Sequence, residues 1–143
     1  MSLPVIIIML IMRKVSYPQE KVFAFYFLEV VHPRPVLFIG NLLLYIFIFA
    51  PLQCYITRSG YQSVLTSLVP RSLKVRALAI IAIALSFGVA HLSSGLKHAG
   101  ATMLIALYWG IMFEIRKSII ALSVSHALIG FIGIFWLGLN RLG

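Results

Sequence analysis

The strongest indication of the fold is the apolar run at residues 36–57, VLFIGNLLLYIFIFAPLQCYIT, which contains no charged side chain. A helix of about 20 mainly apolar residues is long enough to cross the hydrocarbon core of a bilayer. Three more apolar runs follow at residues 77–92, 99–113 and 118–139. The sequence therefore predicts an all-α, polytopic transmembrane helix bundle with four clear membrane helices.

The composition also indicates a membrane protein. Of the 143 residues, 62% are hydrophobic and only 10% are charged, whereas about a quarter of the residues in a soluble domain are charged. The net charge of +9 would suggest nucleic-acid binding in a soluble chain. Here the cations lie in short connections between apolar runs, where they set the orientation in the bilayer. We therefore expect the lipid bilayer, and no nucleic acid, as a partner.

Two weaker apolar stretches precede these runs. Residues 1–12 are too few to cross the bilayer core as a straight helix, so they form a short tilted anchor, a re-entrant piece or part of a longer helix. Residues 22–31 contain Glu29 and are followed by two prolines, which end a helix. We expect residues 1–35 to form an amino-terminal region of short hydrophobic segments, and residues 36–143 to form the membrane core.

The connection at residues 58–76 is the longest polar stretch, and its first half has apolar residues at helical spacing. This pattern is typical of a helix that extends from the membrane or lies in the interface. Cytoplasmic loops collect Lys and Arg, so we place residues 58–76 in the cytoplasm. If residues 22–31 cross the membrane, nine of the 12 Lys and Arg residues are cytoplasmic and three lie on the opposite side.

Two histidines, His91 and His126, lie within apolar runs. An imidazole in hydrocarbon is costly unless it faces a partner or a cavity, so it indicates a site. Phe87 precedes His91 by four residues, which on a helix places both rings on one face. Taken alone, His91 also fits a helix end near the membrane surface. His126 lies beside Ser123 and Ser125, and we expect it to be buried against a partner or a cavity.

A polar group also closes the first long apolar run, where Gln53, Cys54 and Arg58 follow one another within six residues. An arginine at a membrane end usually extends to the lipid headgroups, but Arg58 could also activate the thiol one turn before it. Gln53 fits an interhelical hydrogen bond. Cys54 is the only cysteine, which excludes an internal disulfide, and such a residue is most often small, buried and apolar.

Metal binding is weakly supported. His32 and His98 are expected in loops, at the interface or facing solvent. No two histidines have the i, i+4 spacing of a helical zinc site, and no second cysteine could assist. His91 and His126 are the only weak candidates for metal ligands, and we expect no cofactor.

Two acids need an explanation. Glu114 lies just before Arg116 and Lys117, so a local ion pair accounts for it. Glu29 is the only carboxylate within an apolar run and is a candidate for a buried acid.

Several stretches together resemble a known family. Residues 87–91 (FGVAH) match an FxxxH motif, and residues 110–120 (GIMFEIRKSII) with residues 125–128 (SHAL) resemble the approach to a third motif. Residues 50–58 (APLQCYITR) align with a first motif, EExxxR. In order and spacing, residues 36–139 resemble the CAAX protease and bacteriocin-processing (CPBP) family of intramembrane proteases. The resemblance implies a multi-pass protein of a bacterial-type plasma membrane that cleaves a membrane-proximal or prenylated peptide.

The chain departs from this family at three motif positions. Gln53 and Cys54 replace the two glutamates, and Gly130 replaces the asparagine of the third motif. In the family, the first glutamate and the FxxxH histidine are thought to activate a water, and the last histidine and the asparagine steady the oxyanion. A glutamine amide cannot act as a general base, and loss of an oxyanion donor costs about 100- to 1,000-fold in rate. The remaining motif residues are Arg58, His91 and His126.

Three hypotheses are consistent with these residues. In the first, the chain is catalytically degenerate and binds a peptide, a lipid or a partner subunit in the former active-site cavity. In the second, it is an active intramembrane endopeptidase that uses Glu29 or another group as its base. In the third, it is a thiol endopeptidase with Cys54 as the nucleophile. Its base would be His91 or His126, and Arg58 would favour the thiolate.

Overall fold

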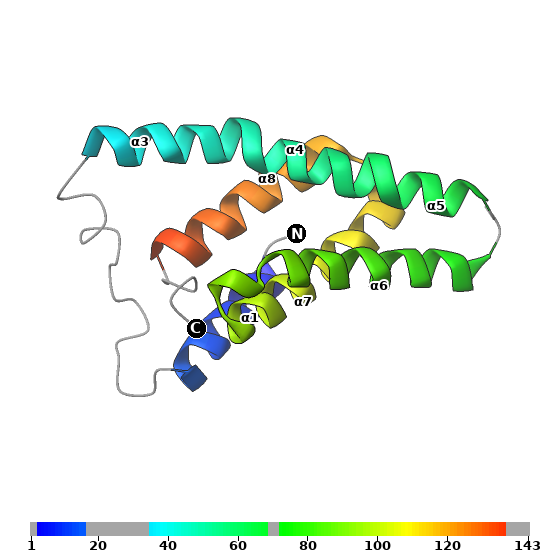
Figure 1. Cartoon of the computed structure of the whole chain (residues 1–143), viewed down its shortest axis with the longest axis horizontal. Helices are drawn as coiled ribbons and strands as arrows, with labels where there is room; N and C mark the ends of the chain where they lie inside the picture. The colour runs from blue at the N-terminus through cyan, green and yellow to red at the C-terminus, as the bar shows by residue number, and fades with distance from the viewer. Residues whose placement is uncertain (1–2, 17–34, 69–71, 137–143) are drawn as a thin grey trace.

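The computed structural model describes residues 3–16, 35–68 and 72–136, and nearly all of these residues are helical (Figure 1). No strand occurs within these three ranges. The prediction of an all-α bundle is therefore confirmed. The expected weak segment at residues 22–31, with Glu29, lies outside the described residues, and so does His32.

The chain from Pro35 to Leu68 is one long, nearly straight helix that runs along one side of the molecule (Figure 1). It alternates between α and π turns, as α3 (Pro35–Leu44), η1 (Tyr45–Phe49), α4 (Ala50–Cys54), η2 (Tyr55–Gln62) and α5 (Ser63–Leu68). Short π segments inside helices are frequent at functional sites. The helix is continuous to Leu68, so the first half of the polar connection extends the membrane helix; this confirms the first of the two placements expected for it.

The next two helices, α6 (Leu73–Ala90) and α7 (Leu96–Arg116), form an antiparallel hairpin joined by the short turn η3 (Leu92–Ser94). Gly95 follows this turn with a φ of 98°, which a residue with a side chain rarely adopts. The two helices approach closely at Gly88, where an added Cβ would lie 2.9 Å from a side-chain carbon of α7. Small residues allow such contacts between membrane helices.

The last of the described helices, α8 (Ile119–Gly130), continues as the π segment η4 (Phe131–Trp136) and passes beside α4 (Figure 1). A sharp turn separates it from α7, because Lys117 adopts a left-handed conformation with a φ of 50°. Ser118 then starts α8 by accepting a hydrogen bond from the backbone N–H of Ala121 at 3.3 Å. A serine in this position is a typical helix N-cap.

Among the described residues, three helices, Val36–Leu68, Leu73–Ala90 and Leu96–Arg116, are long and apolar enough to cross a membrane, and Ile119–Gly133 is a shorter apolar helix. The fourth predicted membrane helix, at residues 118–139, is present from Ile119 to Trp136, and residues 137–139 lie outside the described residues. The amino-terminal helix α1 (Leu3–Ser16) packs its buried Met9 into the core of the bundle. The other buried members of this core are Cys54, Trp109, Phe113, Leu122 and Ile129.

Candidate functional site

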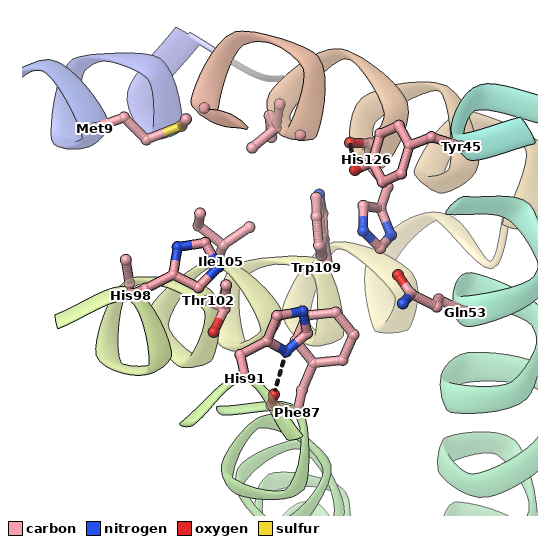
Figure 2. A pocket seen from close by; sticks show the side chains of 14 residues that line it. Met9, Tyr45, Gln53, Phe87, His91, His98, Thr102, Ile105, Trp109 and His126 are labelled. Carbon is pink, nitrogen blue, oxygen red and sulfur yellow. Dashed lines mark hydrogen bonds between the residues drawn. The ribbon is translucent and has the colours of Figure 1, made fainter. Parts of the chain in front are cut away.

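A cavity of about 110 Å³ lies among α1, η1, α4, α6, α7 and α8 (Figure 2). One buried water needs about 10–15 Å³, so the cavity has room for several waters or for one small group of a larger ligand. The side chains that give it a polar character are Gln53, His91, His98, Thr102 and His126. Gln53 of the first motif and His126 of the third motif therefore line the same cavity as His91.

His91 caps the end of α6, and its ring is held by its own helix. Its Nδ1 lies 2.7 Å from the carbonyl oxygen of Phe87. Because a carbonyl can only accept, Nδ1 is the protonated nitrogen, and in the uncharged ring Nε2 then carries a lone pair. The Phe87 and His91 rings stand 4.7 Å apart between centroids. The prediction that these two side chains share one helix face is confirmed.

His126 comes from the middle of α8 and is buried, with 6% of its surface exposed. Its ring stacks against Trp109 at 4.2 Å between centroids. Trp109 is fixed in turn, because its indole N–H donates to the hydroxyl of Ser125 at 3.2 Å. Phe87 approaches the imidazole edge-on at 5.9 Å. The prediction that His126 is buried against a cavity rather than exposed to lipid is confirmed.

Gln53 and Cys54 are neighbours in sequence, but they have different surroundings. Gln53 lines the cavity, and its amide lies between the levels of His126 and His91 (Figure 2). The thiol of Cys54 lies 3.4 Å from Nδ1 of His126, yet Cys54 is only 2% exposed and is not part of the cavity wall. Cys54 therefore supports the His126 ring from within the protein.

Arg58 lies inside the bundle, with 2% of its surface exposed. Its Nη1 donates to Oε1 of Gln62 at 2.9 Å, and its Nη2 donates to the carbonyl oxygen of Ala106 at 2.7 Å. The usual placement of a membrane-end arginine, with its head among the lipid headgroups, is therefore wrong for Arg58. Neither of these bonds involves Cys54, so the guanidinium is used to join η2 to α7.

A chain of polar groups continues from Gln62 to the end of α7. The amide nitrogen of Gln62 donates to the carbonyl of Gly110 and to Oε1 of Glu114, each at 3.0 Å. Glu114 also pairs with Lys117 at 2.9 Å and lies 3.9 Å from Arg76. The predicted local ion pair of Glu114 is therefore confirmed for Lys117.

Sequence reasoning missed His98, which was expected in a loop. It is 7% exposed, lies in the first turn of α7 and lines the cavity, with its ring 5.8 Å from that of His91 (Figure 2). The cause is the helix boundary, since α7 begins at Leu96 rather than at residue 99. Tyr45 and Trp109 also line the cavity, and they were missed because aromatic residues are common in membrane helices.

Within residues 3–16, 35–68 and 72–136, no group of three or more His, Cys, Asp and Glu side chains lies close enough together to hold a metal ion. The described cavity wall offers imidazoles, an amide and hydroxyls, between the aromatic rings of Tyr45, Phe87 and Trp109. Such a site can bury a small uncharged group and hydrogen-bond to it.

The chain was compared with known proteins. The family model described as type II CAAX prenyl endopeptidase Rce1-like matches residues 35–132. No curated protein and no solved structure matches the chain. The match includes Gln53, Arg58, His91, His126 and the Gly130 position.

Proposed function

The chain belongs to the type II CAAX prenyl endopeptidase Rce1-like family, as the sequence resemblance predicted, and we propose that it is a non-proteolytic member of that family. In this proposal the former active-site cavity binds a membrane-embedded peptide, including one that carries a lipid group, without cleaving it. The observation that carries the proposal is the place of Gln53, whose amide lines the same cavity as His91 and His126.

Hydrolysis of a peptide needs a group that takes a proton from the attacking water. Gln53 stands where the resemblance places the glutamate that acts with the FxxxH histidine on the water, and an amide oxygen is too weak a base for this step. The lone pair of His91 is then left without that partner. Glu114 is the only Asp or Glu among the described residues. Its carboxylate already accepts a hydrogen bond from Gln62 and pairs with Lys117. The two histidines of the cavity can still form hydrogen bonds to a ligand, and binding requires nothing more.

The walls of the cavity favour a group from the membrane interior. Trp109 packs against His126 on one side, and Phe87 packs against both His91 and His126. Aromatic walls with a few convergent polar groups are typical of sites that bury an apolar ligand and fix one polar group of it. A peptide bond beside an apolar or lipid-modified side chain has this character.

The test uses the whole chain in lipid nanodiscs and a farnesylated CAAX peptide that carries a photoreactive diazirine. We expect the peptide to be crosslinked and to be recovered uncleaved. Thr102→Phe, which fills the cavity, should reduce crosslinking by about tenfold, whereas Leu104→Phe, on the exposed face of the same helix, should leave it unchanged. Cleavage by the unaltered chain that disappears in His91→Ala would overturn the proposal.

A second candidate function is favoured by the distance of 3.4 Å between the thiol of Cys54 and Nδ1 of His126. A thiol next to an imidazole is the core of a cysteine endopeptidase. In that case N-ethylmaleimide should label Cys54 within minutes, and Cys54→Ala should abolish cleavage of the farnesylated peptide. Because Cys54 is 2% exposed and outside the cavity wall, we expect slow labelling and no effect of Cys54→Ala on crosslinking.

A further inference from the structure

Gly130 and Tyr45 share one space at an end of the cavity. A Cβ added to Gly130 would overlap the hydroxyl oxygen of Tyr45 and lie 2.5 Å from the ring carbon Cζ. The phenol therefore occupies the volume that a side chain at position 130 would take. Both residues, together with His126, line the cavity. Any other residue at position 130 would force the tyrosine to move.

Tyr45 reaches this place from the opposite helix. It is the first residue of η1, and its ring stands over His126 at 6.2 Å between centroids, nearly perpendicular to the imidazole (Figure 2). Its hydroxyl donates to the backbone carbonyl of His126 at 3.3 Å. Hydrogen bonds between oxygens are usually 2.5–3.0 Å long, so this contact is weak, and a ligand oxygen at a shorter distance would compete for the hydrogen.

On the premise of the proposed binding function, we infer that Tyr45 supplies the ligand-binding group that residue 130 lacks. Its hydroxyl donates a hydrogen bond to the carbonyl oxygen of the bound peptide bond. The amide of Gln53 lies on the other side of His126 and faces the same space (Figure 2). Gly130, at the third-motif position, has no side chain. In this inference Tyr45, 85 positions earlier in the sequence, fills that space and supplies the hydrogen-bond donor.

The shared space is tested without any ligand. We expect Gly130→Ala to lower the thermal unfolding midpoint of the detergent-solubilised chain, and we expect this loss to disappear in a Tyr45→Ala background. Gly100→Ala is the matched control, since nothing lies within 4 Å of a Cβ at that position. An equal effect of Gly130→Ala with and without the tyrosine would refute the shared space.

The binding role is tested with the farnesylated diazirine peptide in nanodiscs. Tyr45→Phe keeps the ring and removes only the hydroxyl, so we expect about fivefold weaker crosslinking at limiting peptide. The matched control is Tyr55→Phe, because Tyr55 is 61% exposed and lies outside the cavity. In Tyr45→Ala the crosslinking should fall further, and the added substitution Gly130→Asn should restore at least half of it. Simple support of the fold by Tyr45 predicts that Gly130→Leu, which has a similar shape to asparagine but no hydrogen-bond donor, rescues Tyr45→Ala equally well; we expect no rescue by leucine.

The two proposals fail in different ways. If the unaltered chain does not crosslink the peptide at all, the proposed binding function is wrong, and the role of the hydroxyl falls with it. If the chain crosslinks the peptide and Tyr45→Phe crosslinks it equally well, the function stands and the role of Tyr45 is refuted.

Discussion

Gln62 is the side chain whose loss should weaken the bundle most clearly. It is fully buried in the structure, and its amide accepts from Arg58 at 2.9 Å. It also donates to Gly110 and Glu114, each at 3.0 Å. The substitution Gln62→Leu has similar volume and removes all three bonds. Two of these bonds join η2 to α7, so the perturbation acts on the packing of two membrane helices.

The expected cost follows from these three bonds. A hydrogen bond between membrane helices contributes on average about 0.6 kcal/mol, so the two bonds from Gln62 to α7 contribute about 1.2 kcal/mol. Removal of the third bond leaves one donor of a buried guanidinium without its acceptor, which costs about 1–2 kcal/mol. We therefore expect Gln62→Leu to lower the free energy of unfolding by about 2–3 kcal/mol.

The assay is reversible unfolding in mixed micelles of dodecyl maltoside and sodium dodecyl sulfate, followed by far-ultraviolet circular dichroism. Ser67→Ala is the control, because the hydroxyl of Ser67 bonds only within its own helix turn at an exposed position; it should change the free energy by less than about 0.5 kcal/mol. Glu114→Gln keeps an acceptor for Gln62 and should cost less than Gln62→Leu. A Gln62→Leu variant as stable as Ser67→Ala would refute the reasoning.

Four further substitutions test how the helices are capped and packed, by thermal unfolding. Gly88→Ala should destabilise the α6–α7 contact by about 1–3 kcal/mol, whereas Gly100→Ala, in open space, should stabilise its helix by up to about 1 kcal/mol; equal effects would contradict the close approach. Ser118→Ala removes the N-cap of α8 and should cost about 1 kcal/mol, and an unchanged midpoint would show that the cap is dispensable. Trp109→Phe keeps an aromatic ring beside His126 but loses the hydrogen bond to Ser125, so we expect it to cost about 1 kcal/mol of stability. An unchanged stability would show that this hydrogen bond does not hold the ring in place.

The helices could be predicted from the sequence because their signal is local. Each is an apolar run, and its existence does not depend on what it packs against. The ends were less accurate, as residues 58–68 show. Polar side chains there suggested that the apolar run ends at residue 57 and continues as a helix extended from the membrane or lying in the interface, but Arg58 and Gln62 are buried in the bundle and bonded to each other. Their spacing of four residues on a helix was a readable sign of that bond.

The site was only partly predictable, for a physical reason. His91 and His126 are costly in hydrocarbon, and this cost identified them in the sequence. Tyr45 has no such cost, because an aromatic residue is ordinary in a membrane helix, and its position depends on the absence of a side chain at Gly130 on another helix. Such complementarity between distant positions cannot be read from one sequence.

The contacts of Arg58 and His126 show that a motif residue of this family can have a structural role as well as a catalytic one. Arg58 is bonded to Gln62 within η2 and to Ala106 of α7, and the second bond joins two helices whether or not a peptide is cleaved. His126 is packed against Trp109 and touches Cys54, so it too contributes to the core. Both residues therefore have structural contacts that do not depend on catalysis. In the proposed function, what separates binding from catalysis is the chemistry of the cavity wall, where the amide of Gln53 takes the position that the resemblance assigns to a carboxylate.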